Sequence, residues 1–568
     1  MAFKFKLIKK CYQDASGIDY DDADFFIEEN DWNDYSYYVT YHLHATPHIT
    51  HKKTLYLGYI KIMLKGQKSG EYNLLRKAFS PHVVFEELPD GFVSLTQSID
   101  VFEGLNHLLD AQQKKDFVSQ MHLILSSDND EYYAMVEGEP ALEKGLLRDS
   151  SMQSFSLAKG REIMLSGETH YDLRRQEMTL KFNHVEGEVK LNFSFLPEFK
   201  SVKIPNGVMA FIGKNGSGKS TIIYELAKVL YAYPDKRFWL KEVIGSIEPQ
   251  DIGISKLFLI SYSPFDNFVL PGIGGEDYRL ILEGLENGKG RLVFCCIRDV
   301  KSELERILDS PNDATYNELY KHVRVGDTNL KTVVMLGQEC ASAIRDLEVD
   351  QNRKQLWEEI ASTASTMFPD IQQRMSSLVN AIDEESIINE FLSLSTGFKY
   401  FLHSLSRVVA YIEKDSMLLF DEPENHIHPP MLSFMIRALR MVLSRYNSIL
   451  MIATHSPVIV QETFSENVYV VRNMGDRTEV KHPQIEAYGA NIGEITSEVF
   501  DLTTDVTNYY DAYDKIYEKW EFDDEWDNMD DMLKSFRQRM NGKISHQMLS
   551  YIISKYIDEH PNEDYGGN

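Results

Sequence analysis

Short apolar runs separated by polar turns recur from residue 208 onward, and this pattern predicts a buried sheet. The runs cover residues 208–212, 256–260, 417–420 and 448–453. Each is followed by a glycine, serine, aspartate or threonine, as expected for strands that are buried on both faces. Residues 221–230 follow the first run with apolar side chains at helical spacing. The pattern therefore predicts an α/β fold over this part of the chain.

A glycine-rich segment joins the first predicted strand to the predicted helix. It fits the phosphate-binding pattern G-x-x-x-x-G-K-[ST]. Glycines let backbone N–H groups surround phosphates, and the helix N-terminus adds its positive end. Lys219 is expected to reach the β- and γ-phosphates, and Ser220 to hold Mg²⁺. A glycine-rich surface turn is the alternative, which the flanking strand and helix disfavour. The candidate loop consists of Gly213, Lys214, Asn215, Gly216, Ser217, Gly218, Lys219, Ser220 and Thr221.

Two acids follow the apolar run at 417–420, where an α/β sheet places its chemistry. Asp421 is expected to bind Mg²⁺ through water, and Glu422 to polarise the attacking water. Pro423 cannot continue a strand ladder, so the strand should end there. An acidic loop after a core strand is the alternative, and the phosphate-binding loop makes it the weaker one.

Two further motifs have a place in the same site. His455 follows the run at 448–453, and a neutral imidazole there could bond the γ-phosphate or the attacking water. Ser395 and Gly397 lie in Leu-Ser-Thr-Gly-Phe, where Ser395 is the expected N-cap of a helix. Ser-x-Gly is common at helix starts, so this motif gains weight only from its position before the acidic strand.

The four motifs, in this order, resemble those of ABC-type ATPase heads over residues 186–500. The resemblance implies ATP and Mg²⁺ as cofactors, with Lys219, Glu422 and His455 as the catalytic residues. It also implies a homodimer or higher homo-oligomer, because the signature serine of one subunit caps the γ-phosphate held by another. The family usually carries a Gln after the strand at 256–260, and none follows here. Ser263 or Asp266 could replace it, and slow hydrolysis is expected.

Composition narrows the class of protein. The 568 residues are 43% hydrophobic and 26% charged, which is ordinary for a globular protein of several domains. A net charge of −28 disfavours indiscriminate DNA binding and favours a protein partner, although short basic stretches occur at 301–306 and 534–539. The four cysteines are too few and scattered for a disulfide framework. No signal peptide or membrane-spanning run is evident, so a cytoplasmic protein is expected.

The pattern divides the chain into three regions. Residues 1–185 form an α+β region of unclear function, with strands expected at 35–46 and 54–64 and helix over 99–125. Within the head at 186–500, residues 272–390 lack a sustained heptad pattern, and a helical lid is expected there. Residues 501–568 form an acidic, aromatic, helical tail. Its stripe at Tyr513, Tyr517 and Trp520 either packs on the head or binds a partner.

Four histidines cluster near the first predicted strands. His42 and His44 share a strand face, and His48 and His51 follow a turn. The acid-rich segment at 19–34 is expected to be an exposed loop. Because no Cys or carboxylate completes a ligand set in this prediction, exposed strand histidines are favoured over a metal site.

Residues 422–429 read Glu-Pro-Glu-Asn-His-Ile-His-Pro, which resembles the corresponding stretch of OLD-like anti-phage ATPases. OLD nucleases add a TOPRIM domain after the head, and no such site is evident here. The chain also resembles the PtuA group, the ATPases of Septu and retron defence operons. That resemblance implies an HNH nuclease partner (PtuB-like) and admits a retron reverse transcriptase with its RNA–DNA.

Three functions therefore compete. The first is a regulatory ATPase of a defence complex that controls a partner HNH nuclease. The second is a repair or OLD-like ATPase acting directly on DNA, which predicts hydrolysis stimulated by DNA with steep salt dependence. The third is a scaffold that holds ATP with little hydrolysis, a reading motivated by the missing Gln.

Overall fold

The structure is a computed structural model. It describes residues 2–9, 23–30, 34, 36–51, 54–79, 84–147, 152, 155–165, 173–193, 206–232, 240–249, 252–264, 268–272, 275–287, 290–309, 329–364, 368–500, 509–524 and 526–560. Expectations for Asp266 and for Cys11 fall outside these residues. The chain forms two compact units, residues 1–492 and 493–568.

A seven-stranded sheet, with the order β12-β11-β13-β14-β9-β15-β16, forms the centre of the first unit. Neighbouring strands are parallel, except that β16 is antiparallel to β15. Strand β14 lies between β9 and β13, so the strand before the phosphate-binding loop and the strand before the acids are not neighbours. The strands are β9 (Val208–Ile212), β11 (Leu257–Ser261), β12 (Leu292–Cys296), β13 (Met417–Asp421), β14 (Ile449–Thr454), β15 (Val468–Asn473) and β16 (Thr478–Lys481).

Side chains of the central strands alternate between two hydrophobic cores. On β13, Leu418 and Phe420 pack into the core beneath the helical layer, and Met417 and Leu419 pack into the opposite core. Every residue of β9, β11, β13 and β14 is buried. The predicted buried strands are confirmed, because continuous apolar runs are what a sheet covered on both faces requires.

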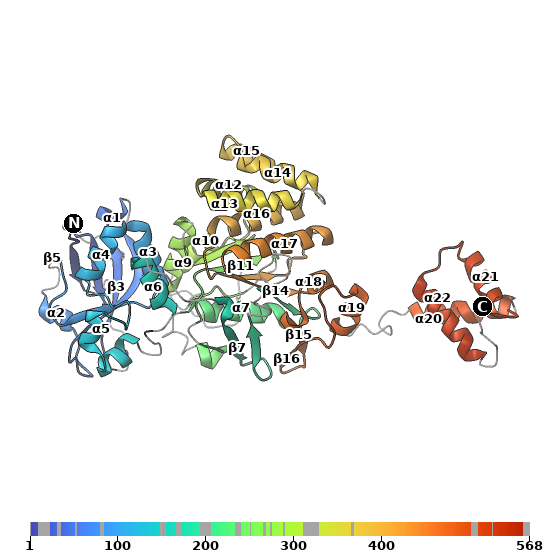
Figure 1. Ribbon diagram of the computed structural model, residues 1–568, viewed down its shortest axis with the longest axis horizontal. Helices are drawn as coiled ribbons and strands as arrows, with labels where there is room; N and C mark the ends of the chain where they lie inside the picture. The colour runs from blue at the N-terminus through green and yellow to red at the C-terminus, as the bar shows by residue number, and fades with distance from the viewer. Residues whose placement is uncertain are drawn as a thin grey trace. The chain divides into compact units, whose positions relative to one another are not determined.

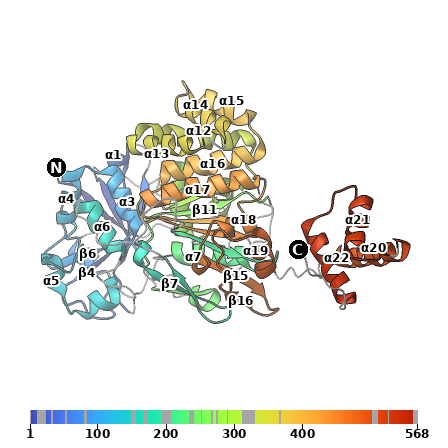
Figure 2. The same cartoon turned by 45° about the vertical axis from the view of Figure 1, so that its right-hand side comes forward.

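Helices cover one face of this sheet in two tiers, which both views of the ribbon display (Figures 1 and 2). Helices α16 and α17 lie next to the sheet, and α12 to α15 lie beyond them. Leu405 of α16 and Leu439 of α17 belong to the same core as the sheet residues. The helices are α12 (Val333–Val349), α13 (Gln351–Thr363), α14 (Pro369–Val379), α15 (Glu384–Ser393), α16 (Thr396–Tyr411) and α17 (Pro429–Arg445).

The expected helical lid over 272–390 needs a correction, because its first part belongs to the sheet. Strand β12 pairs in parallel with β11, between helices α9 (Gly275–Asn287) and α10 (Val300–Asp309). Cys295 faces one core and Cys296 the other, because successive residues of a strand point to opposite faces of the sheet. In the described part of this segment, helices that follow one another with no strand between them begin at α12.

The opposite face carries α7 (Lys219–Tyr231) and a three-stranded antiparallel sheet. That sheet has the order β10-β7-β8 and consists of β7 (Glu177–Phe182), β8 (Val189–Asn192) and β10 (Gly245–Glu248). Leu180 and Leu191 pack with Leu226 of α7 in the second core. The helix that follows the phosphate-binding loop is therefore packed between two sheets.

A six-stranded sheet, with the order β5-β1-β2-β3-β4-β6, forms the N-terminal part of the first unit. Helices α3, α4 and α6 share a core with it. The expected helix over 99–125 is two helices, because Asp110 forms a capping box at the start of α4. The elements are β1 (Phe5–Ile8), β2 (Phe25–Glu29), β3 (Thr40–Ala45), α1 (Pro47–Thr50), β4 (Leu55–Leu64), α2 (Leu74–Ala78), β5 (Val84–Phe85), β6 (Phe92–Leu95), α3 (Ile99–Leu108), α4 (Ala111–Gln120), α5 (Glu131–Val136) and α6 (Phe155–Leu165).

The acid-rich segment at 19–34 is not an exposed loop where the structure describes it. Residues 25–29 form β2, with Phe25 and Ile27 buried in the core. The acid count misled the prediction, because residues 25–27 form a short, buried apolar run within the acidic segment.

The second unit is a small helical bundle with its own core. It comprises α20 (Tyr509–Asp524), α21 (Met529–Arg539) and α22 (His546–Glu559), after α19 (Ile492–Phe500) at the boundary. Tyr517 of the aromatic stripe is fully buried with Phe536 and Tyr556, and Tyr513 and Trp520 pack at the edge of this cluster. The stripe is therefore occupied by the helices of its own unit. No described helix of the chain has both the length and the apolar composition needed to cross a membrane.

Candidate functional site

The carboxyl ends of the central strands bring the candidate residues to one edge of the sheet. Thr454 pairs with Ile212, the residue before the glycine-rich loop, and Asp421 pairs with both Ala453 and Ser261. Four segments separated widely in sequence therefore end at the same level. This edge is where an open parallel sheet binds its ligands.

The phosphate-binding loop is held by close backbone contacts. A Cβ at Gly213 would lie 2.2 Å from the carbonyl oxygen of Val471 on β15, so a larger residue cannot be placed there without moving the strand. Gly218 has a φ of +102°, in the left-handed region where glycine carries no steric penalty. Asn473 donates a hydrogen bond to the carbonyl of Gly216 at 3.2 Å. The loop shape thus depends on β15 as well as on its own glycines.

Lys219 and Ser217 direct polar atoms into this loop. Lys219 Nζ donates hydrogen bonds to the carbonyl oxygens of Gly213 and Lys214, each at 3.0 Å. Burial lowers the pKa of Lys219, and the nearby carboxylates Glu422 and Asp421 oppose that shift. Ser217 Oγ is buried and has no hydrogen-bond partner among the described residues. Donors confined to a narrow loop in this way suit a phosphate group.

Asp421 lies at the end of β13 and contacts the first turn of α7. Ser220 Oγ donates to Asp421 Oδ1 at 2.8 Å, and the hydroxyl of Tyr224 donates to Oδ2 at 3.0 Å. The two residues predicted to hold Mg²⁺ therefore touch, although 201 positions separate them in sequence. A hydroxyl and a carboxylate are oxygen ligands of the kind that Mg²⁺ requires.

The acids after β13 are fixed by different partners. Glu422 has a φ of +47°, and its Oε2 accepts a hydrogen bond from Asn425 at 2.9 Å. Glu424 Oε1 accepts from the hydroxyl of Thr454 at 2.7 Å and from the backbone N–H of His455 at 2.6 Å, and lies 3.0 Å from His455 Nδ1. Glu422 and His455 thus point from adjacent strand ends, each with its own orienting group.

The predicted signature motif lies at the start of α16, as expected. Ser395 is the N-cap residue, but its side chain makes no capping hydrogen bond. A Cβ at Gly397 would lie 2.3 Å from the carbonyl oxygen of His426, so this glycine permits the helix to approach the turn after the acids. Among the described residues, no hydrogen bond joins Ser395 to the phosphate-binding loop.

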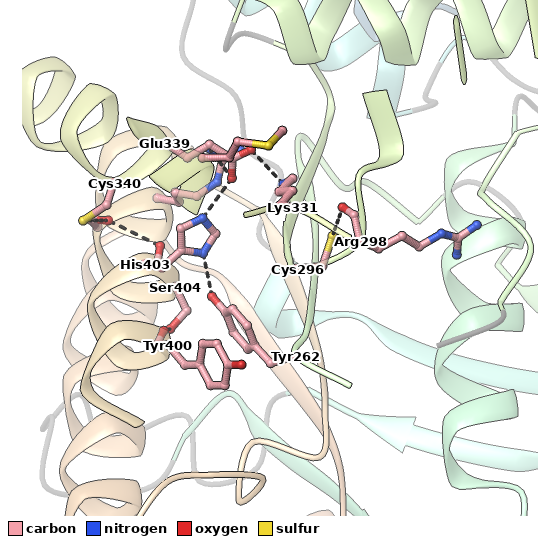
Figure 3. A network of polar contacts seen from close by, with 12 residues as sticks. Tyr262, Cys296, Arg298, Lys331, Glu339, Cys340, Tyr400, His403 and Ser404 are labelled. Atoms are coloured by element: carbon pink, nitrogen blue, oxygen red, sulfur yellow. Dashed lines mark hydrogen bonds and ion pairs between the residues drawn. The ribbon is translucent and has the colours of Figure 1, made fainter. Parts of the chain in front are cut away.

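A buried polar network connects the sheet to α16, as Figure 3 shows. The hydroxyl of Tyr262, the residue after β11, donates to His403 Nδ1 at 2.7 Å, and His403 Nε2 donates to Glu339 Oε2 of α12 at 2.9 Å. Lys331 lies 2.7 Å from Glu339 Oε1. The Tyr262 ring also stacks on Tyr400 at 4.3 Å. The strand after which a Gln was expected is therefore tied to the signature helix by Tyr262.

The environment of the network makes His403 neutral. Burial lowers the pKa of His403 to about 4, against the opposing effect of its bond to Glu339. Burial raises the pKa of Glu339, but Arg407, His403 and Lys331 together hold it well below its usual range. A neutral imidazole has one donor and one acceptor, and both are used here.

Sequence reasoning missed the residues that orient the expected ones. Tyr224, Asn425 and Glu424 each make one of the contacts described above, and no motif position marked them as functional. Tyr224 could have been found, because it lies one helical turn after Ser220 on the same face. Ser263 and Asp266 were the two residues expected to replace the missing Gln. Ser263 follows Tyr262 in the structure, and Asp266 lies outside the described residues.

Two comparisons relate the chain to known proteins. Residues 297–461 match the family described as "AAA domain, putative AbiEii toxin, Type IV TA system". Over 503 residues the chain is 27% identical to protein ea59 of Escherichia phage lambda, a match that spans 85% of this chain and 87% of that protein. The family match includes the acidic strand, the signature helix and His455, and it begins after the phosphate-binding loop.

Proposed function

We propose that the chain binds and hydrolyses Mg²⁺–ATP and uses this cycle to control a partner nuclease, a proposal supported by the match of residues 297–461 to an AAA-domain family. The contact between Ser220 and Asp421 at 2.8 Å is the observation that carries the ATPase proposal. It joins the helix after the loop to the acidic strand and assembles two oxygen ligands at one point. A turn without a ligand would have no reason to bring this partly buried pair together beside Lys219.

The residues of the loop suit a triphosphate. In the proposed complex Lys219 Nζ exchanges its bonds to the carbonyls of Gly213 and Lys214 for phosphate oxygens. Ser217 Oγ, which is buried and has no partner in the described part of the chain, gains an acceptor in the same step. Mg²⁺, held through Ser220 and Asp421, would neutralise phosphate charge. The two buried donors, Lys219 Nζ and Ser217 Oγ, thereby have acceptors in the complex, as buried polar groups require.

Glu422 is the proposed general base for the attacking water. Its bond from Asn425 fixes the carboxylate direction, and the left-handed backbone at this residue turns it away from the strand axis. His455 is the proposed sensor of the γ-phosphate. Its Nδ1 lies 3.0 Å from Glu424 Oε1, and the imidazolium form would donate Nδ1–H to this carboxylate and Nε2–H to a phosphate oxygen.

Ser395 and Gly397 are proposed to complete the site of a second subunit. Support comes from the exposed start of α16, where the Ser395 hydroxyl makes no capping bond within its own chain. Free helical N–H groups at that position suit a phosphate presented by another copy. Closure of two copies around two ATP molecules is then the conformational signal.

The first test separates binding from hydrolysis. Glu422→Gln should lower ATP turnover by about 10² to 10⁴-fold, because a general base contributes that much, while ATP binding is retained. Phosphate release and equilibrium dialysis with ATP measure the two properties. Glu466→Gln, which changes an exposed carboxylate elsewhere in the unit, is the matched control and should behave as wild type. Unchanged turnover in Glu422→Gln would exclude the proposed base.

The second test addresses the shared site. Lys219→Ala removes the loop function of one copy, and Ser395→Arg blocks the signature of another. Each variant alone should be inactive, and an equal mixture should recover about a quarter of wild-type turnover, because half the dimers contain one intact composite site. A mixture with no recovered activity, from chains that still associate, would contradict the shared site.

The partner proposal rests on the family resemblance and on charge. The net charge of −28 favours a basic protein partner over DNA. Affinity isolation of the chain from its native operon, with mass spectrometry, should recover an HNH nuclease whose DNA cleavage changes with Glu422→Gln. A chain isolated alone, with hydrolysis stimulated steeply by DNA at low salt, would instead support direct action on DNA.

A further inference from the structure

Three metal-ligating side chains meet on one face of the N-terminal sheet, outside the nucleotide site. Glu28 of β2 pairs in register with His42 of the antiparallel β3, and Phe26 pairs with His44. Residues two apart on a strand face the same side, so Glu28 lies opposite His42 and diagonal to His44. The opposite face of these strands is the apolar core, which contains Ile27 and Leu43.

The distances within this cluster suit a zinc ion. Glu28 Oε2 lies 3.1 Å from His44 Nε2 and 3.8 Å from His42 Nδ1. One ligand atom from each residue falls within 4.8 Å of the others. Ligand atoms about 2.0–2.2 Å from a tetrahedral zinc ion are roughly 3.3 Å apart, so small side-chain movements would close the site.

The surroundings position the imidazoles. The ring of Tyr56 on β4 lies against both His42 and His44, with centroids 5.5 and 5.0 Å away. The Asn30 amide lies 2.9 Å from His42 Nε2. Amide orientation is assigned from such contacts, and with its oxygen toward the ring Asn30 would accept the Nε2–H and leave Nδ1 for a metal. Metal-bound histidines usually have such an outer partner.

We propose that Glu28, His42 and His44 bind one Zn²⁺ ion with an open fourth position for water or an anionic ligand. Two imidazoles and one carboxylate match zinc better than the oxygen-seeking Mg²⁺ of the nucleotide site. The three side chains are only 12–15% exposed. Solvent can therefore reach the cluster while the surrounding residues hold the three side chains in place. The sequence alone disfavoured a metal site here, because Glu28 was expected in an exposed loop. The pairing of β2 with β3 instead places Glu28 beside the two histidines.

The test is zinc content of the full chain after chelation, reloading with Zn²⁺ and dialysis. Wild type should retain one zinc per chain, and zinc should raise its unfolding temperature. Glu28→Gln and His44→Gln, which preserve side-chain size, should lose both properties. Asn30→Ala should weaken affinity by about tenfold, as expected for an outer partner. His48→Gln, which removes an exposed imidazole three residues beyond β3, is the matched control and should retain zinc.

Cobalt substitution identifies the geometry. Co²⁺ in wild type should give the strong visible absorption of a tetrahedral N/O site, and His44→Gln should abolish it. Zinc absent from wild type, or retained in Glu28→Gln and His44→Gln, would overturn the proposal and leave a hydrogen-bonded histidine pair. Because no readout involves ATP, failure here leaves the proposed ATPase function unaffected.

Discussion

At the residue scale, Gly397, like Gly213, leaves no room for a side chain. An added Cβ would lie 2.3 Å from the His426 carbonyl oxygen, which belongs to the backbone and cannot rotate away. Gly397→Ala should therefore push the start of α16 off the turn after the acids. We expect a loss of about 1–3 kcal/mol in unfolding free energy, as for overpacked sites, together with lower ATP turnover.

Calorimetry and phosphate release measure the two effects of Gly397→Ala. The neighbouring Thr396 is exposed, so Thr396→Ala is a suitable control that should leave stability within about 0.5 kcal/mol. An alanine at 397 that folds and hydrolyses ATP as well as wild type would show that the helix start can move without consequence.

At the scale of elements, the Tyr262–His403–Glu339 network makes the contact between sheet and helical layer sensitive to acid. The pKa of His403 is lowered to about 4 in the folded chain from an ordinary value of 6.5. Between pH 6.5 and 4 the His403 imidazole is protonated in the unfolded chain and neutral in the folded chain. The stability that the neutral imidazole contributes is therefore fully present above pH 6.5 and is lost as the pH falls toward 4. Glu339, whose pKa is also lowered, adds to this loss at lower pH.

His403→Gln should flatten this pH dependence, because an amide keeps a donor and an acceptor but does not titrate. The fall in unfolding free energy between pH 6.5 and 4 should shrink by about 2 kcal/mol, a discounted conversion of the pKa shift. Calorimetry at several pH values measures it, with His428→Gln as the exposed-histidine control. If His403→Gln and wild type lose the same unfolding free energy between pH 6.5 and 4, a group other than His403 causes the pH dependence.

Local patterns predicted the elements that depend on local sequence, and missed those that depend on pairing. The strands before Gly213, Asp421 and His455 are continuous apolar runs, so their burial could be predicted. The contact between Glu28 and His42 arises from antiparallel pairing, which no local pattern encodes. Tyr262 was likewise invisible, because its partner His403 lies 141 positions away. The resemblance to the PtuA group and its nuclease partner stays a prediction.

At the scale of the whole molecule, the second unit should fold without the first. Its core joins Tyr517, Phe536 and Tyr556 from three helices, and Lys555 pairs with Asp514 across them. A fragment of residues 493–568 should be helical by circular dichroism and unfold cooperatively. Phe536→Ala should remove about 3–5 kcal/mol and unfold it, because small domains have little stability in reserve.

The surface of the same bundle provides the control for that experiment. Phe522 is 85% exposed, so Phe522→Ala should leave the unfolding of the fragment nearly unchanged. A fragment without cooperative unfolding, in either background, would mean that the second unit needs the rest of the chain.

Strand β14 has both edges paired, to β13 and β9, and all six of its residues are buried. Its amide protons are therefore shielded from solvent by neighbours in every direction. Local fraying cannot reach them, so they should exchange with deuterium only when the whole sheet opens. The segment that leads to His455 should then be the slowest-exchanging peptide of the first unit, and its rate would report the global stability directly.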